Sequence, residues 1–132
     1  MEKITKQEVD DFRKQYDKFD DFTDEIVKYI MDKKYVKYLT GFNQIEDFAI
    51  FDCSNTTFDI RLEEYNENDC YWLQIPWEHV YNDTWKEYID ELVREDIEKE
   101  KARQQKEIER REEREKQELK RLLEKYGNQE NV

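Results

Sequence analysis

The chain has 132 residues, of which 44% are charged and only 36% are apolar, and its formal net charge is −12. This length suits one domain with or without an appendage, and the acidity argues against direct binding to nucleic-acid phosphates. Neither an apolar run of about 18 residues nor a secretory signal is present, so we expect no membrane span and a cytoplasmic protein with free thiols.

The charge is divided unevenly along the chain. Residues 98–132 contain 11 Lys and Arg against 10 Asp and Glu, whereas residues 1–97 contain 12 and 25. Most aromatic side chains also lie in the first part, which can therefore bury a core despite its acidity. We predict an acidic α+β head at 1–97, a charged helical extension at 98–127 and a tail at 128–132.

Residues 6–34 are predicted to form an amphipathic helix. Thr5 and Glu8 match a capping box at its start. Apolar residues then recur at alternating spacings of three and four, which is typical of one stripe along a helix. The stripe consists of Val9, Phe12, Tyr16, Phe19, Thr23, Ile26 and Ile30. The Asp and Thr residues within 19–24 leave a break into two helices open, because both types also cap helices.

Three strands are predicted at residues 45–53, 57–65 and 70–75, where the apolar period shortens to that of a strand. The connections between them are short and rich in Ser, Asn and Asp, which implies an antiparallel meander. Cys53 and Cys70 fall inside strands, and we expect them to be small core residues. The side chains expected to form the buried face of the sheet are Phe58, Ile60, Leu62, Leu73 and Ile75.

A short helical turn and a long helix are predicted after the third strand. Pro76 ends that strand and is expected to be the first residue of a turn that reaches Tyr81. Thr84 and Glu87 form a second capping box, which opens the last helix. The apolar face of residues 85–93 should dock on the sheet together with the first helix. The expected architecture is an α+β fold with an N-terminal helix, a three-stranded antiparallel β-meander and a long charged C-terminal helix.

The last helix changes character after its first turns. In residues 98–118, 16 of 21 residues are charged, with eight of each sign. A continuous helix over residues 84–126 would be about 65 Å long, and Gly127 is a natural stop. Near its end lies an apolar patch of Leu119, Leu122, Leu123 and Tyr126.

Three interpretations of this charged segment remain open. It can be an isolated helix held by ion pairs four residues apart, each of which contributes about 0.2–0.5 kcal/mol. It can join copies of the chain into an oligomer through the apolar patch, although residues 98–118 lack the apolar positions of a regular coiled coil. It can also be partly disordered, as its composition permits.

The sequence offers no set of residues typical of an active site. His79 is the only histidine, and no cysteine lies at metal-ligand spacing from it. Asp52, Asp59 and Glu63 are the best candidates for a divalent cation, but acidic residues are so frequent here that chance produces such sets. With two glycines in the chain, there is no phosphate-binding loop. We therefore predict no catalytic residue, no metal and no cofactor.

An acidic row along the first helix gives the most specific functional hypothesis. Asp10, Asp17, Asp21 and Asp24 lie at offsets of 0, 7, 11 and 14, so they share one side of a helix. Such a row can imitate phosphates and occupy the nucleic-acid-binding groove of another protein. The competing interpretation is a solvated face, partly neutralised by three lysines. These lysines are Lys14, Lys18 and Lys28.

One stretch resembles short uncharacterised proteins encoded by tailed bacteriophages, in which a strand ends in a proline turn and a long Glu/Lys/Arg helix follows. The matching parts here are Ile75-Pro76-Trp77-Glu78-His79-Val80, then Trp85, and Leu119-Lys120-Arg121-Leu122-Leu123-Glu124-Lys125-Tyr126. The resemblance covers roughly residues 46–127. It implies a viral origin and a bacterial host cytoplasm, and it transfers no chemistry and no site residues.

These features together predict a binding protein, an inhibitor that occupies a basic, nucleic-acid-binding surface of a bacterial protein. The alternative is a structural protein that assembles through its long helix, and a metal-dependent enzyme is a third possibility. Beyond the acidic row, contacts with a partner or with a second copy are expected at Trp77, His79, Leu119, Leu122, Leu123 and Tyr126.

Overall fold

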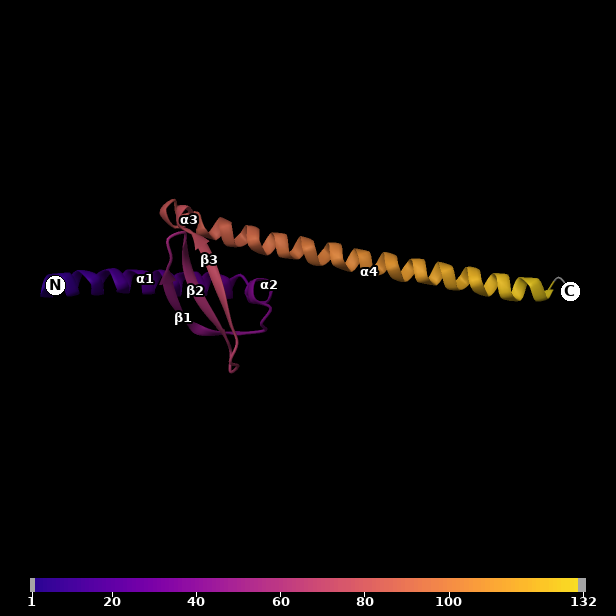
Figure 1. The fold of residues 1–132 in the computed structure, drawn as a ribbon, viewed down its shortest axis with the longest axis horizontal. Coiled ribbons are helices and arrows are strands. Elements are labelled where there is room, and N and C mark those ends of the chain that lie inside the picture. The colour runs from indigo at the N-terminus through magenta and orange to yellow at the C-terminus, as the bar shows by residue number, and fades with distance from the viewer. Residues whose placement is uncertain (1, 131–132) are drawn as a thin grey trace. The chain divides into compact units, whose positions relative to one another are not determined.

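The computed structural model describes residues 2–130, and it has the predicted α+β architecture (Figure 1). The elements in chain order are α1 (Lys6–Asp32), α2 (Val36–Thr40), β1 (Ile45–Cys53), β2 (Thr57–Glu64), β3 (Cys70–Pro76), α3 (Trp77–Tyr81) and α4 (Trp85–Glu130). Two compact units are present, Met1–Arg94 and Glu95–Val132. Their boundary lies three residues before the predicted one, and the last two residues of the predicted tail lie outside the described residues.

Helix α1 begins with the predicted capping box. The Glu8 backbone N–H donates to the Thr5 hydroxyl at 3.2 Å, and the Thr5 backbone N–H donates to the Glu8 carboxylate at 3.3 Å. The helix then runs without interruption through the residues at which a break was considered. The Thr23 hydroxyl donates to the Phe19 carbonyl at 2.8 Å. Because this polar group is satisfied within the helix, it does not start a new one.

The three strands form an antiparallel sheet in the order β1-β2-β3, as predicted. Ile60 at the centre of β2 lies opposite Phe51 of β1 and Leu73 of β3. The register of β1 shifts between Ile45 and Ala49. This irregularity turns the start of the edge strand away from regular pairing.

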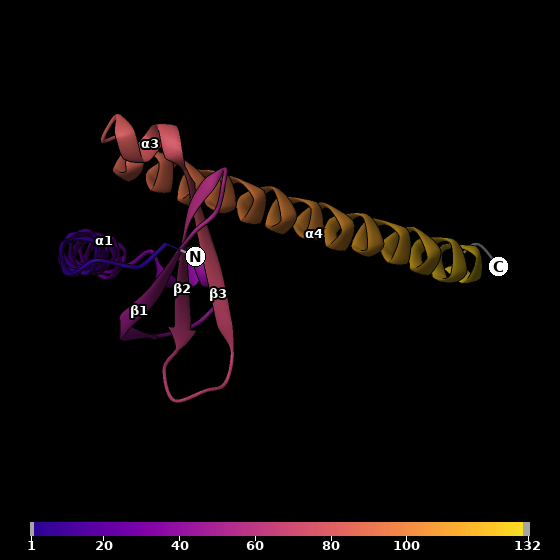
Figure 2. The same ribbon diagram turned by 60° about the vertical axis from the view of Figure 1, so that its left-hand side comes forward.

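The core lies between one face of the sheet, α1 and the first turns of α4. All five side chains expected on the buried face are at most 1% exposed, and burial of each contributes about 1.5–3 kcal/mol. The Phe22 ring of α1 lies 5.4 Å from Phe58 and 5.8 Å from Trp85 of α4. Figure 2 shows α1 end-on beside β1, and α3 lies where β3 ends. The residues that pack the core from the helices are Ile26, Val27, Ile30, Trp85, Ile89 and Val93.

Two predicted details at helix ends differ from the structure. Pro76 belongs to β3 and precedes α3, so Trp77 and not Pro76 is the first helical residue. Gly127 does not end α4, which continues to Glu130. A glycine permits the left-handed conformation of a helix stop but does not require it, and keeping it helical costs only about 1 kcal/mol relative to alanine.

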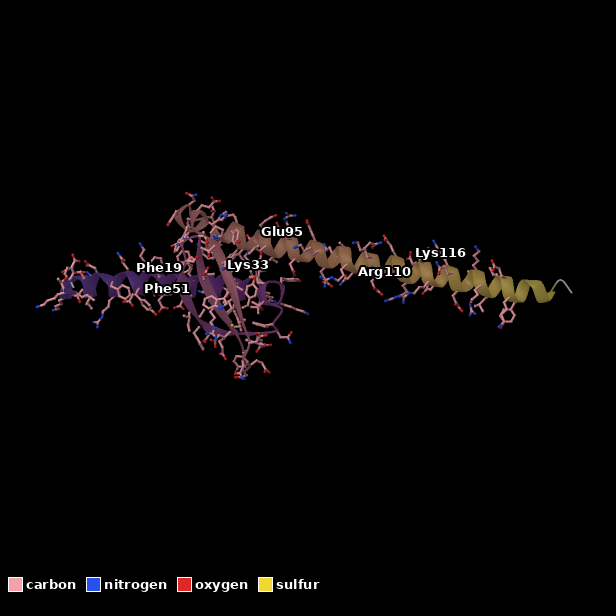
Figure 3. All side chains as sticks on the ribbon, in the orientation of Figure 1. Phe19, Lys33, Phe51, Glu95, Arg110 and Lys116 are labelled. Atoms are coloured by element: carbon pink, nitrogen blue, oxygen red, sulfur yellow. The ribbon has the colours of Figure 1, made fainter. Side chains whose placement is uncertain are left out.

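The charged segment is helical throughout its described residues, as an isolated helix or a helical oligomer contact requires. Its ion pairs include Arg103 with Glu100 at 3.1 Å and Arg121 with Glu118 at 2.7 Å. Both join residues three apart, whereas the sequence had suggested a spacing of four. All four of these side chains are mostly exposed, so each pair contributes little to stability. Side chains along this segment, such as Arg110 and Lys116, stand on the helix surface in Figure 3.

Candidate protein-binding surfaces

The acidic row lies on a single uninterrupted helix, α1. Asp17, Asp21 and Asp24 are exposed, and Asp10 is half-buried. From its first to its last residue the row extends about 21 Å along the helix, since the two are 14 residues apart and each residue adds 1.5 Å. Fixed carboxylates at this spacing attract cationic side chains and raise their rate of encounter at low salt. Whether the row binds a partner stays a prediction.

The amino-terminal half of α1 presents an apolar face that the sheet covers only in part. Val9, Phe12 and Tyr16 are 38%, 66% and 49% exposed, although the sequence placed them in the same stripe as the core residues. The stripe is partly covered at Tyr16 and more fully at Phe19, whose ring lies 5.8 Å from Phe51 of β1. Phe19 and Phe51 are labelled in Figure 3. Periodicity therefore identified the correct face of the helix but not how much of it is buried.

This apolar face leads into a shallow cleft where α1 meets the end of β1. The cleft has a volume of about 280 Å³, and its apolar walls include Phe12, Tyr16, Phe19 and Phe51. Tyr16 and Phe51 have ring centroids 5.0 Å apart. Cys53 and Asp52 complete its rim. The cleft has the size and lining to receive one or two apolar side chains from another protein.

Cys53 is exposed, so the prediction that it is a core residue is wrong. It is the last residue of β1 and lies on the rim of the cleft that Phe12 and Tyr16 of α1 also line. Desolvation, followed by the charges of Asp52 and Asp59, raises the pKa of its thiol. A raised pKa lowers the fraction of nucleophilic thiolate at neutral pH. Cys70 is half-buried.

Trp77 and His79 make their contacts within the head. The Trp77 indole N–H donates to the Ser54 carbonyl at 2.8 Å, and its ring packs against Phe58. His79 Nδ1 lies 2.8 Å from the Thr84 hydroxyl, just before α4 begins. Both residues are half-buried. These contacts give each a structural role that does not depend on a partner.

A cluster of Tyr29, Tyr35 and Asp90 was not foreseen from the sequence. Both tyrosine hydroxyls donate to the same Asp90 oxygen, at 2.6 Å from Tyr29 and 2.9 Å from Tyr35. Burial, and then the hydrogen bond to Asp90, raises the pKa of both phenols. The ammonium group of Lys86 also lies 5.6 Å from the centre of the Tyr29 ring. The hydrogen bond from Tyr29 to Asp90 joins α1 to α4. The residues of the cluster are too far apart in sequence to form a local motif.

The carboxylates considered for a metal do not form a site. Asp52 and Asp59 lie opposite each other on β1 and β2, whereas Glu63 is 3.5 Å from the Arg61 guanidinium. Within residues 2–130, no group of three His, Cys, Asp or Glu side chains could hold a metal ion. The same part of the chain has no helix that is both long enough and apolar enough to cross a bilayer.

The apolar patch near the end of α4 is exposed. Leu119, Leu122, Leu123 and Tyr126 are 59%, 36%, 63% and 53% exposed. Comparisons of the chain with protein-family models, curated proteins and solved structures found no match. The resemblance to tailed-phage proteins therefore stays a prediction, and a functional proposal depends on the surfaces described above.

Proposed function

We propose that this protein acts by binding a basic surface of another protein through the acidic row of α1. The observation that supports the proposal most directly is that Asp17, Asp21 and Asp24 are exposed on one uninterrupted helix. A rigid row loses little conformational entropy when it binds, which favours recognition of an equally regular array of cations. The partly covered apolar face beside the row can supply contacts that do not depend on charge.

The resemblance to phage proteins points to a bacterial protein as the partner, and the row suits a groove that normally holds nucleic acid. The whole chain has a net charge of −12, so it competes with nucleic acid for cationic surfaces and does not itself bind phosphates. Blocking such a groove requires no chemistry in the inhibitor.

The proposal is tested by capturing a partner from a bacterial lysate, purifying it and measuring its association kinetics. Exchange of Asp10, Asp17, Asp21 and Asp24 together for Asn should lower the association rate at low salt about tenfold or more. Moderate salt should remove most of this difference, because exposed charges are screened beyond about 10 Å at 0.1 M.

The matched control changes four exposed carboxylates of α4 to amides, which removes the same amount of charge elsewhere. The control residues are Glu107, Glu109, Glu112 and Glu115. It should bind at nearly the parental rate. If the two quadruple variants bind alike, net charge and not the row determines association, and the proposal fails.

A second function, self-assembly, is favoured by the exposed apolar patch of α4. Four large apolar side chains within eight residues of an otherwise charged helix are typical of a contact surface. Sedimentation of the full chain and of a chain ending at residue 97 tests this function. Assembly requires that the shorter chain remain monomeric at concentrations where the full chain associates.

A further inference from the structure

Two exposed apolar segments of the chain have the same spacing. One consists of Val9, Phe12 and Tyr16 on α1, and we call it the α1 seam. The other consists of Leu119, Leu122 and Tyr126 on α4, and we call it the α4 seam. Each has residues at offsets of 0, 3 and 7 on a helix, which are the a and d positions of one heptad. Side chains at equal spacing can interlock when two such helices pack together.

We propose that the α4 seam of one copy packs against the α1 seam of a second copy. The proposal rests on the self-assembly function above and identifies the surface that receives the α4 patch. The receiving surface is more than a bare helix face, because the α1 seam leads into the cleft beside Phe51. A leucine or tyrosine of the α4 seam that enters this cleft gains contacts from α1 and β1 together.

Charge favours packing of an α4 seam on an α1 seam over packing of two identical seams. Residues 6–24 around the α1 seam contain four Lys and Arg against seven Asp and Glu, whereas residues 116–126 contain four against two. The two segments therefore have net charges of opposite sign. Pairing of two α1 seams would instead bring two acidic segments together.

The exposed area indicates a reciprocal dimer. If the whole exposed area of the seam residues and Leu123 became buried, one contact would bury about 650 Å² in total, since large side chains present roughly 150–250 Å² each. That is too small for a stable interface, which buries about 1,200–2,000 Å². Each copy carries one seam of each kind, so a reciprocal dimer forms two contacts and reaches roughly 1,300 Å². We therefore expect a dimer of modest affinity.

The acidic row stays accessible in this arrangement. Its residues lie about 120° around α1 from the α1 seam, at 100° per residue. A helix packed on the seam consequently leaves Asp17, Asp21 and Asp24 open to a different partner. Self-assembly and the binding of a basic surface are compatible in one molecule.

Sedimentation velocity of the full chain, from micromolar to near-millimolar concentration, tests the proposal with two single variants. Phe12→Glu places a charge in the α1 seam, and Leu119→Glu places one in the α4 seam. Both residues are exposed in the single chain, so both variants should fold, which far-UV circular dichroism verifies. Each should raise the dissociation constant of the dimer at least tenfold, because a charge would be buried against apolar side chains.

The matched controls are Phe48→Glu in the head and Ile108→Glu in α4, which introduce the same charge at exposed apolar positions outside the seams. They should associate like the parent chain. If only Leu119→Glu weakens association, the α4 patches pair with each other, which overturns this inference but leaves self-assembly standing. A parent chain that stays monomeric at every concentration overturns both.

Discussion

At the scale of single residues, the Tyr29–Tyr35–Asp90 cluster makes stability sensitive to alkaline pH. The pKa of both phenols is raised in the folded state, so folding retains protons that the unfolded chain releases near pH 10. The stabilisation is complete below pH 10 and declines as the pH rises above it. Urea unfolding at pH 8, 10 and 11 should show a falling free energy of unfolding over that window.

Tyr29→Phe should lower the free energy of unfolding at pH 7 by about 1–1.5 kcal/mol, because it removes one hydrogen bond to Asp90. The variant should also lose less stability between pH 8 and 11, since only one of the two phenols with a raised pKa remains. Tyr81→Phe at an exposed position controls for the loss of a phenol. An alkaline decline of equal size in the Tyr29→Phe variant and the parent would contradict this assignment.

The sequence contains no signal for this cluster because its members are 55 and 61 residues apart. Their contact depends on how α1 and α4 pack, which no local spacing encodes. The wrong prediction that Cys53 is a core residue has a related cause. Its position inside a strand was predictable, but its exposure depends on how closely α1 packs against the end of β1, which the pattern of the strand does not encode.

At the scale of elements, the two glycines of the chain should respond oppositely to the same substitution. Gly41 has a φ of +79°, a conformation that costs an alanine roughly 1 kcal/mol or more. Gly127 is helical, and a Cβ there would meet no atom within 4 Å. Gly41→Ala should lower the thermal midpoint of the head, whereas Gly127→Ala should stabilise the end of α4 by about 0.5–1 kcal/mol.

Amide hydrogen exchange separates these two effects. Gly127→Ala should slow exchange in the last turns of α4 and leave the sheet unchanged. Slower exchange in those turns is the expected sign that the glycine is helical in solution. Faster exchange there would instead show that Gly127 ends the helix, as the sequence alone had suggested.

Alternation and capping allowed the main elements to be predicted, and the limits of that prediction have physical reasons. Phe58, Ile60 and Leu62 alternate with polar residues on β2, and a period of two fixes which face is buried. The stripe on α1 was equally regular, yet Phe12 and Tyr16 are exposed. The spacing of apolar residues indicates which side of a helix they share. Burial also requires that another element pack against that part of the helix. The residues of the stripe that are exposed, Val9, Phe12 and Tyr16, are also those of the candidate binding surface.

At the scale of the whole molecule, the core and the acidity both reside in the first unit. Residues 1–94 contain 12 Lys and Arg against 23 Asp and Glu, and residues 95–132 contain 11 against 12. The core residues of the described chain also lie before residue 95. Stability should therefore be a property of the head, whereas assembly should need both units.

A chain ending at Arg94 should consequently fold alone, with a thermal midpoint within about 5 °C of the full chain, which corresponds to roughly 1 kcal/mol for a domain of this size. A chain ending at Thr84 is the matched comparison. It also lacks Trp85, Ile89 and Val93, each at most 2% exposed, whose burial contributes about 1.5–3 kcal/mol apiece. Their loss approaches the whole stability of a small domain, so this chain should be unfolded by circular dichroism. If the two shortened chains behave alike, the first turns of α4 are not part of the folded head.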